Sequence, residues 1–482
     1  MSAFFSHYML DSAYDEMFDA EWRARPHYRA LIEELLVNSP EVLRQRQLEA
    51  DRAFITQGIT FTVYGDDQGT ERIFPFDLLP RILTGREWDT LERGLAQRLT
   101  AVNLFLKDIY HEGRILSEGV VPPDLVYSCR HYRREMRGVR VHKDIYVSIA
   151  GTDLIRLEDG QFVVLEDNLR VPSGVSYMLA NREVTKRVFP GLFTRYNVKP
   201  IAHYGQSLLA TLRTLTPANR AEPTIVVLTP GVGNSAYFEH AFLAREMGVP
   251  LVEGRDLLVE GSRVFMRRTH GRRQVDVIYR RIDDDFLDPL TFRRDSLLGV
   301  PGLINAYRHG TVALANAPGA GVADDKSVYA FMPRLIKYYL DEDPLLPQVP
   351  TYLGFRPDDF TYITEHAHEL VVKTTGDAGG YGMLMGPFAA KAEVECYVAR
   401  MRANPGNYIA QPLVELSSHP THVDGRFEPR RIDLRPFILY GDRVRVLPGG
   451  LTRVALRPGS YVVNSSQGGG SKDTWVLAPR DA

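Results

Sequence analysis

The sequence predicts a mixed α/β (α+β) fold, on three observations. Apolar residues recur at helical spacing through much of residues 14–130. A strand, a helix and a second strand follow one another over residues 224–253, which predicts a βαβ unit with a parallel sheet. A run of apolar β-formers that begins at Val163 ends in carboxylates and a carboxamide. The 482 residues allow two to four structural units around a large core.

The expected elements follow from changes of period along the chain. Helical spacing is clearest at residues 28–36 and 91–109. A hairpin is expected within residues 142–181, followed by helix and loop at 184–217. Further strands are expected at residues 224–228, 249–253, 275–279, 369–373, 408–416, 432–440 and 443–447, and helices at 237–247, 329–340 and 391–402.

Composition narrows the class of protein. Hydrophobic residues make up 44% and charged residues 24%, as in ordinary globular proteins. A net charge of −2 without a long Lys/Arg block predicts no nucleic-acid partner. The two cysteines, Cys129 and Cys396, cannot form a disulfide framework. Because there is neither a signal-like N-terminus nor an apolar run of membrane-spanning length, we expect a cytoplasmic protein without a membrane partner.

The expected hairpin carries the first candidate site. Successive strand residues point to opposite faces, so Glu166 and Asn168 share one face while Asp167 points away. Asp153 would begin the preceding strand, with the turn supplied by Asp159-Gly160. Three oxygen donors on one face suit a hard cation such as Mg²⁺. The alternative is a merely polar strand end, since acidic strand ends are common.

The second candidate site is a strand that ends in Lys373 and continues into the glycine-dense segment 376–382. Glycines let backbone N–H groups approach phosphate oxygens, and a lysine at the strand end neutralises their charge. The order is not that of a Walker A motif, because the lysine precedes the glycines. A simple hairpin tip is the alternative.

Two further segments contain suggestive residues. Gly231-Val232-Gly233 follows a strand, but Ala236 stands where a dinucleotide fingerprint needs its third glycine, so a tight turn suffices and a nicotinamide enzyme is a remote alternative. Asp324 and Asp325 can cap the helix that follows them, which leaves Lys326 without a structural role.

The C-terminal part adds two strands. Residues 411–415 continue an apolar strand, which by itself indicates only core. Asp433 and Arg435 share a face of the later strand, although alternating charged residues of this kind are often solvated.

Together these segments resemble the circularly permuted ATP-grasp family (type 2), whose relatives include glutathionylspermidine synthetase. The resemblance spans residues 14–477, and the segments 166–178 and 464–475 look like hallmarks of its bacterial members. In ordinary ATP-grasp enzymes the lysine and glycine loop come first. Here Asp153, Glu166 and Asn168 precede Lys373 by about two hundred residues, an order that is tolerable when chain ends lie close together.

The resemblance implies a role for each matching residue. Asp153, Glu166 and Asn168 match Mg²⁺ ligands. The ATP-binding set comprises Lys326 and Lys373 at the phosphates, Gly379, Gly380 and Gly382 in the covering loop, Gln411 and Leu413 at adenine, and Glu415 near the ribose. Many ATP-grasp enzymes carry an arginine two residues before the aspartate, where this chain has Gly151. Arg170 or Arg435 could supply the missing positive charge. The candidate catalytic residues are therefore Lys373, Arg170 and Arg435.

The resemblance also implies an organisation and an activity. A helical N-terminal region is expected at 1–135, a core half with the Mg²⁺-binding hairpin at 136–220, a βαβ pre-ATP-grasp domain at 221–328, and the nucleotide-binding lid with the remaining core at 329–482. The implied function is an ATP-dependent carbon–nitrogen ligase that joins a carboxylate and an amine through an acylphosphate. A phosphotransferase and a catalytically silent ATP-binding scaffold are the alternatives.

Two more segments could contribute to the site. Residues 229–239 should line the acceptor side, with Ser235 and Glu239 as candidates. The serine-glycine segment from Ser465 to Lys472 is expected to be either a second closing loop or a disordered tail.

Overall fold

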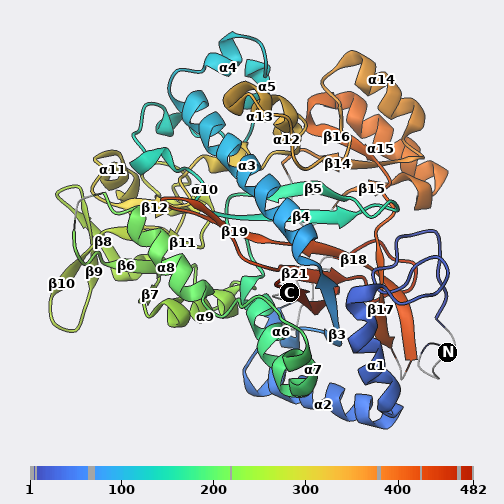
Figure 1. Ribbon diagram of the computed structural model, residues 1–482. Helices are drawn as coiled ribbons and strands as arrows, with labels where there is room; N and C mark the ends of the chain where they lie inside the picture. The colour runs from blue at the N-terminus through green and yellow to red at the C-terminus, as the bar shows by residue number, and fades with distance from the viewer. Residues whose placement is uncertain are drawn as a thin grey trace.

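The computed structural model of the chain describes residues 5, 8–62, 71–217, 220–376, 382–423, 426–463 and 468–479. It is a mixed α/β molecule, as the sequence predicts, with several sheets and helices around them (Figure 1). The largest sheet has nine strands. Its path is β20-β19-β4-β18-β21-β22-β3, with β5 paired to β4 and β17 paired to β18. These strands are β3 (Phe76–Leu83), β4 (Ile149–Arg156), β5 (Phe162–Asn168), β17 (Ser418–Val423), β18 (Arg426–Arg435), β19 (Phe437–Tyr440), β20 (Val444–Val446), β21 (Leu451–Val454) and β22 (Gly470–Val476).

Helices cover both faces of this central sheet. The 26-residue helix α3 (Gly85–Tyr110) crosses one face and begins with a capping box between Thr84 and Glu87 (Figure 1). Its apolar side packs in one cluster with Leu154 and Val164 of the hairpin. On the other face, α2 (Pro40–Thr56) and α6 (Val175–Val188) pack in a second cluster with strands β3, β19 and β21. The sheet is therefore buried on both faces.

The expectation of a mainly helical start holds for α1 (Arg29–Val37), α2 and α3 but misses three strands, of which β3 is the longest. β3 is buried along its whole length and pairs in parallel with β22 near the end of the chain. Pro80, together with the charged Asp77 and Arg81, makes this stretch look like a loop, because proline and charge are unusual in an inner strand. Asp77 and Arg81 can be buried in this strand because each has an ion-pair partner that is distant along the chain, Lys472 for Asp77 and Glu16 for Arg81.

The expectation for the serine-glycine segment is wrong where the structure describes that segment as a strand. From Gly470 onward it forms β22, which is buried throughout, and Lys472 forms a buried ion pair with Asp77. Lys472 is therefore neither in a closing loop nor in a disordered tail. Residues 464–467 lie outside the described residues.

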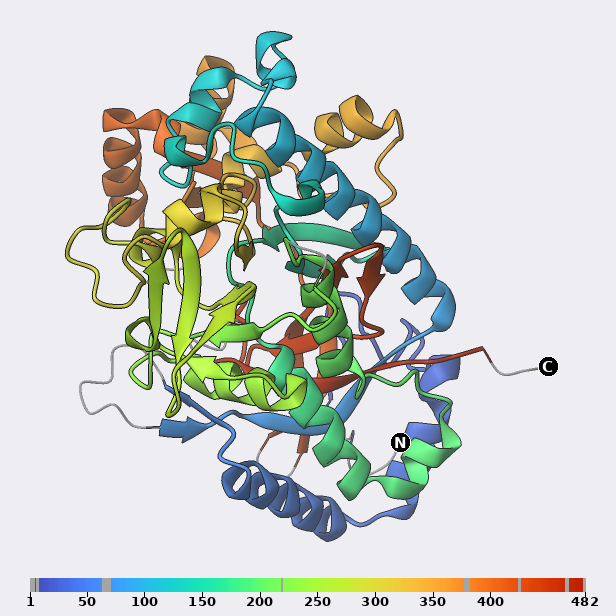
Figure 2. The same cartoon turned by 90° about the vertical axis from the view of Figure 1, so that its left-hand side faces the viewer.

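A second unit contains the predicted βαβ segment. β6 (Ile225–Leu228), β7 (Leu251–Val252), β11 (Val277–Arg280) and β12 (Ala313–Ala315) form a sheet whose pairs are all parallel. α9 (Tyr237–Met247) connects β6 to β7, and α8 (Tyr204–Thr214) packs beside it. The strands β8 (Leu257–Glu260), β9 (Arg263–Arg267) and β10 (Arg272–Val275) form an adjoining antiparallel sheet that the sequence did not reveal. Figure 2 shows this unit across the molecule from α3.

A third unit has its own small core. The four-stranded sheet β13 (Tyr352–Leu353), β16 (Tyr408–Pro412), β14 (Leu370–Thr374) and β15 (Leu384–Met385) is covered by α14 (Pro357–His366) and α15 (Lys391–Ala403) (Figure 1). β16 ends at Pro412 rather than at residue 416, and the expected strand 432–440 is divided at Pro436 into β18 and β19. Proline lacks the N–H that would continue each ladder.

The remaining β-strands and α-helices have three to nine residues each. They are β1 (Thr60–Thr62), β2 (Glu71–Ile73), α4 (Arg114–Ser117), α5 (Pro123–Tyr127), α7 (Pro190–Arg195), α10 (Asp284–Leu287), α11 (Leu303–Arg308), α12 (Lys326–Tyr329) and α13 (Met332–Leu340). The last two divide the helix expected at residues 329–340. Among the described residues, no helix combines the length and the apolar character needed to cross a bilayer.

Candidate functional site

The β4–β5 hairpin presents the acidic residues as their alternation predicts. Asp153 pairs with Glu166, and Gly151 pairs with Asn168, in an antiparallel register. On the opposite face Asp167 accepts a hydrogen bond from Thr152 Oγ1 at 3.0 Å and forms an ion pair with Arg98 of α3 at 2.7 Å. Asp153 lies inside β4, not at its start. The hairpin therefore separates a structural acid, Asp167, from Asp153 and Glu166.

Asp153 is held by two arginines. Arg435 Nε lies 2.5 Å from its Oδ1 and Arg435 Nη2 lies 2.7 Å from its Oδ2. Arg453 Nη2 donates to Oδ2 at 2.7 Å. Burial alone would raise the pKa of Asp153, but the guanidinium groups of Arg435 and Arg453 lower it below its usual value. Asp153 is therefore ionised at neutral pH.

Asp433 and Arg435 are not solvated, contrary to what such an alternation usually means. Asp433 is buried and forms an ion pair with Arg453, while Arg435 is only partly exposed. Burial raises the pKa of Asp433 above its ordinary value, although Arg453 opposes that shift. Both side chains belong to one network of alternating charge with Asp153.

The acids of the hairpin and the lysines of distant segments influence one another. Burial raises the pKa of Glu166, the charge of Asp153 raises it further, and Lys326 and Lys373 lower it. Burial lowers the pKa of Lys373 to about 8, and the acids Glu166 and Asp153 oppose this shift while Lys326 adds to it. These four charges therefore lie within electrostatic reach, although Glu166 and Lys373 are about two hundred residues apart.

Lys373 is positioned by the small sheet. It sits near the end of β14, and its Nζ donates to Gln411 Oε1 on the neighbouring strand β16 at 2.8 Å. Gln411 in turn donates from Nε2 to Thr351 Oγ1 at 3.0 Å. This chain of hydrogen bonds fixes the ammonium group that faces the hairpin. The side chain of Gln411 therefore holds Lys373 in place.

The remaining nucleotide candidates have varied surroundings. The backbone N–H of Lys326, the first residue of α12, donates to Thr375 O at 3.2 Å, which joins this helix to the base of the glycine segment. Leu413 directly follows β16.

Glu415 forms an ion pair with Arg431 and accepts a hydrogen bond from Tyr461 at 3.1 Å. Gly382 is exposed with a φ of 69°, whereas Gly379 and Gly380 lie outside the described residues.

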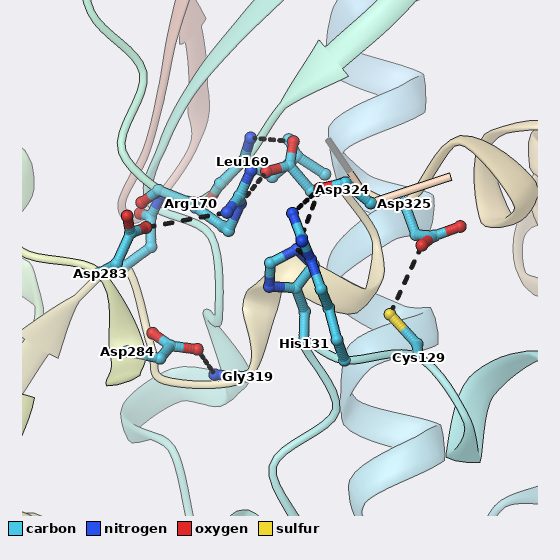
Figure 3. Close-up of polar contacts among 12 residues, drawn as sticks. Cys129, His131, Leu169, Arg170, Asp283, Asp284, Gly319, Asp324 and Asp325 are labelled. Atoms are coloured by element: carbon cyan, nitrogen blue, oxygen red, sulfur yellow. Dashed lines mark hydrogen bonds and ion pairs between the residues drawn. The ribbon is translucent and has the colours of Figure 1, made fainter. Parts of the chain in front are cut away.

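Only one of the two aspartates before Lys326 acts as a cap. Asp325 accepts a hydrogen bond from Ser327 N at 2.8 Å at the start of α12. Asp324 instead accepts from Leu169 N at 3.0 Å and from Arg170 Nε at 2.5 Å (Figure 3). The segment before Lys326 is therefore tied to the end of the hairpin.

Arg170 is engaged away from Asp153. Besides Asp324 it lies 3.8 Å from Asp283, and His131 packs beside it (Figure 3). The glycine at 321 makes room for this packing, because a Cβ there would lie 2.8 Å from Arg170 Cδ and 2.9 Å from His131 Cβ. Of the two arginines that the sequence left as alternatives, Arg435 contacts Asp153 and Arg170 contacts Asp324.

The two residues expected on the acceptor side, Glu239 and Ser235, lie in different surroundings. Glu239 is fully buried, forms an ion pair with Arg281 at 2.9 Å, and accepts hydrogen bonds from Gly174 N and Ser176 N at 2.7 and 3.1 Å. It therefore holds the segment after the hairpin and does not line an open acceptor site. Ser235 lies in the turn between β6 and α9, where Gly231 has a φ of 102°. That turn is the one the sequence predicts.

The donor set has the chemistry of a magnesium site. Among the described residues no three His, Cys, Asp or Glu side chains gather at one point. Asp153 and Glu166 supply two carboxylates, and Asn168 supplies an amide whose buried Nδ2 has no hydrogen-bond partner within the described part of the chain. Mg²⁺ is commonly held by one or two carboxylates and keeps several waters, so these residues fit it.

Sequence reasoning missed Arg453 altogether. It lies on β21, where its neighbours Thr452 and Val454 give no sign of a site. Only the strand register, which pairs Arg453 with Asp433, reveals it. A strand that ends in polar residues can be recognised locally, whereas a buried cation on a third strand cannot.

Acids on a central-sheet hairpin, opposed by a lysine from a separate small α/β unit, define an ATP-grasp type of architecture. The family model for circularly permuted ATP-grasp type 2 matches residues 80–455, and the chain belongs to this family. An uncharacterized protein of Synechocystis is 55% identical over 96% of this chain and 97% of its own length. A Mycobacterium tuberculosis protein, also uncharacterized, is 52% identical over 97% of this chain and 84% of its own length.

Two further likenesses are more distant. A Frankia alni protein that is provisionally named glutamate–cysteine ligase 2-3 is 42% identical over 96% of this chain, but the chain spans only 54% of that protein. The solved apo structure of a glutathione synthetase-like effector from Globodera pallida matches with a TM-score of 0.59 at 12% identity, covering 91% of this chain and 98% of that one. The second likeness shows the shared fold.

Proposed function

We propose that the protein is an ATP-dependent carboxylate–amine ligase that forms an amide bond through an acylphosphate. The observation that carries the proposal is the electrostatic coupling of Asp153 and Glu166 with Lys326 and Lys373, which come from distant segments of the permuted chain. Membership of the ATP-grasp family and the ligase name of the Frankia relative support the same class of reaction.

The charges of the site suit a bound triphosphate. Lys373 and Lys326 would pair with its phosphate oxygens, and Asp153, Glu166 and Asn168 would hold Mg²⁺. When bound, Mg²⁺ would neutralise the phosphate charge that develops during transfer. The backbone N–H of Leu413 would donate a hydrogen bond to adenine, since Pro412 has no N–H, and Glu415 would lie toward the ribose.

Two chemical steps follow. The substrate carboxylate attacks the γ-phosphorus, the bond to ADP breaks, and an acylphosphate forms. An amine then attacks the acyl carbon, loses a proton, and expels inorganic phosphate. The protein contributes positioning and charge neutralisation, and no protein nucleophile is needed. Arg435, which contacts Asp153 and keeps 14% of its side chain exposed, is the arginine that we assign to the transferred phosphoryl group.

The test traps the activated acid. Purified protein is incubated with ATP, Mg²⁺, hydroxylamine and a panel of carboxylic acids, and hydroxamate and ADP are measured. Hydroxamate that depends on one acid would establish acyl activation and name that acid. Phosphorylated product without hydroxamate would indicate a phosphotransferase instead, and ATP binding without any turnover across the panel would indicate a silent scaffold.

Matched variants connect this activity to the site. Glu166→Gln and Lys373→Ala should abolish hydroxamate formation while the protein stays folded. Glu158→Gln changes an exposed acid in the turn of the same hairpin and should leave the rate unchanged. Wild-type rates in folded Glu166→Gln would refute the site assignment.

A further inference from the structure

One guanidinium group joins three strands of the central sheet behind the hairpin. Arg453 on β21 pairs in register with Asp433 on β18, and β18 also pairs with β4, which carries Asp153. Arg453 Nε lies 2.9 and 3.1 Å from the two carboxylate oxygens of Asp433, and its Nη2 reaches Asp153 Oδ2 at 2.7 Å. The side chain therefore spans from the acid on its neighbouring strand to the acid on the strand beyond.

This network is fixed from behind. The side chains of Arg453, Asp433 and Asp153 are 8%, 1% and 2% exposed, so solvent does not compete for their hydrogen bonds. The backbone carbonyl of Asp433 accepts a hydrogen bond from the buried Arg81 at 3.2 Å. Arg435 approaches Asp153 from the more open side, with 14% of its side chain exposed. Of the two arginines, Arg453 is the more firmly anchored.

The charges within the network explain why both partners are present. Arg435 already brings one positive charge to Asp153, and Arg453 alone would add a second. Asp433 offsets the charge of Arg453, so this pair can orient Asp153 without adding to the net positive charge around it. A lysine could supply the same charge, but it lacks the planar fork that contacts two carboxylates at once.

We propose that Arg453, held by Asp433, is a positioning residue that orients the Asp153 carboxylate toward the face it shares with Glu166. Its side chain donates to Asp433 and Asp153, so its effect on the metal would pass through Asp153. This inference rests on the proposed function, because it assumes that Asp153 binds the metal of an ATP-dependent reaction. Hydrogen-bond partners behind metal ligands typically change metal affinity by roughly 10–100-fold when they are removed.

The test measures Mn²⁺ binding by electron paramagnetic resonance, with and without a non-hydrolysable ATP analogue. The double variant Arg453→Met/Asp433→Asn removes two opposite charges together, so the net charge around Asp153 is preserved. If Arg453 positions Asp153, Mn²⁺ affinity should fall about tenfold or more. If the pair only contributes to stability, the affinity of the folded double variant should match the wild type, which would overturn the inference.

Arg453→Lys is the second variant, for the case in which the double variant does not fold. It keeps the positive charge and loses the fork, so positioning predicts weaker Mn²⁺ binding while a purely electrostatic role predicts no change. An unchanged affinity in folded Arg453→Lys would therefore also overturn the inference. If the wild-type protein binds no Mn²⁺, the metal assignment in the proposed function fails, and this inference fails with it.

The chain offers a matched control. Arg182 and Asp473 form a similarly buried pair, with Arg182 Nε 2.9 and 3.1 Å from the carboxylate oxygens. They lie on α6 and β22, outside the network of Arg453, Asp433 and Asp153. Arg182→Met/Asp473→Asn should lower thermal stability and leave Mn²⁺ affinity at its wild-type value. This comparison separates loss of a buried ion pair from loss of position.

Discussion

Replacing Lys373 by methionine isolates the contribution of one ammonium group to nucleotide binding. Methionine keeps an unbranched side chain of similar length, so β14 should retain its packing and its pairing with β16. The substitution removes the buried ammonium group of Lys373 and its hydrogen bond of 2.8 Å to Gln411 Oε1. Glu166 also loses one of the two lysines that lower its pKa.

The expected size follows from those contacts. A hydrogen bond to a charged group contributes about 1.5–3 kcal/mol, and 1.4 kcal/mol corresponds to tenfold in affinity. Lys326 repels Lys373, and relief of that repulsion offsets part of the loss. We therefore expect about 2 kcal/mol, which weakens ATP binding roughly 30-fold.

Isothermal titration calorimetry of ATP with Mg²⁺ measures this change directly. Lys391→Met is the matched control, because Lys391 begins α15 in the same unit and its side chain is 92% exposed, 3.9 Å from Glu395. The control should bind ATP like the wild type. If folded Lys373→Met binds ATP within about threefold of the wild type, the assignment of Lys373 to the phosphates is wrong.

Three further outcomes are expected. Because burial lowers the pKa of Lys373 to about 8 and phosphate favours the protonated amine, ATP affinity should decline as pH rises through about 8, and calorimetry on Lys373→Met should show no such decline. Arg98→Met should lower the free energy of unfolding by about 3–5 kcal/mol, since it leaves Asp167 buried and unpaired, and urea titration should show partial recovery when Asp167→Asn is added. Gly151→Val should displace Arg435 from Asp153 and reduce hydroxamate formation in a folded protein, because even a Cβ there would lie 3.4 Å from Arg435 Cδ; full activity would contradict this.

The parts of the site that the sequence reveals depend on local order. Strand residues alternate between faces whatever surrounds them, so the separation of Glu166 from Asp167 could be read directly and is confirmed by the register. The step from an apolar strand into Lys373 and the glycine segment is equally local. The βαβ unit could be predicted for the same reason, since strand, helix and strand are consecutive.

What the sequence conceals depends on partners that are distant along the chain. β22 reads as a polar tail because Lys472 and Asp473 look solvated, yet Asp77 and Arg182 neutralise them within the core. Asp433 likewise reads as a surface charge until Arg453 is placed beside it. Burial of a charge requires a partner, and one sequence does not show which residue that partner is.

Position 151 shows how a local sequence feature and a distant partner act together. The resemblance to ATP-grasp enzymes leads one to expect an arginine there, and this chain has a glycine instead. Gly151 pairs with Phe437, which places Arg435, two residues before Phe437, at the edge of the same strand pair. A Cβ on residue 151 would lie 3.4 Å from Arg435 Cδ and 3.3 Å from Pro172 Cβ, so there is room for little more than a methyl group beside Arg435. A guanidinium therefore contacts Asp153 after all, delivered from a neighbouring strand, and a larger residue at position 151 would compete with it for that space.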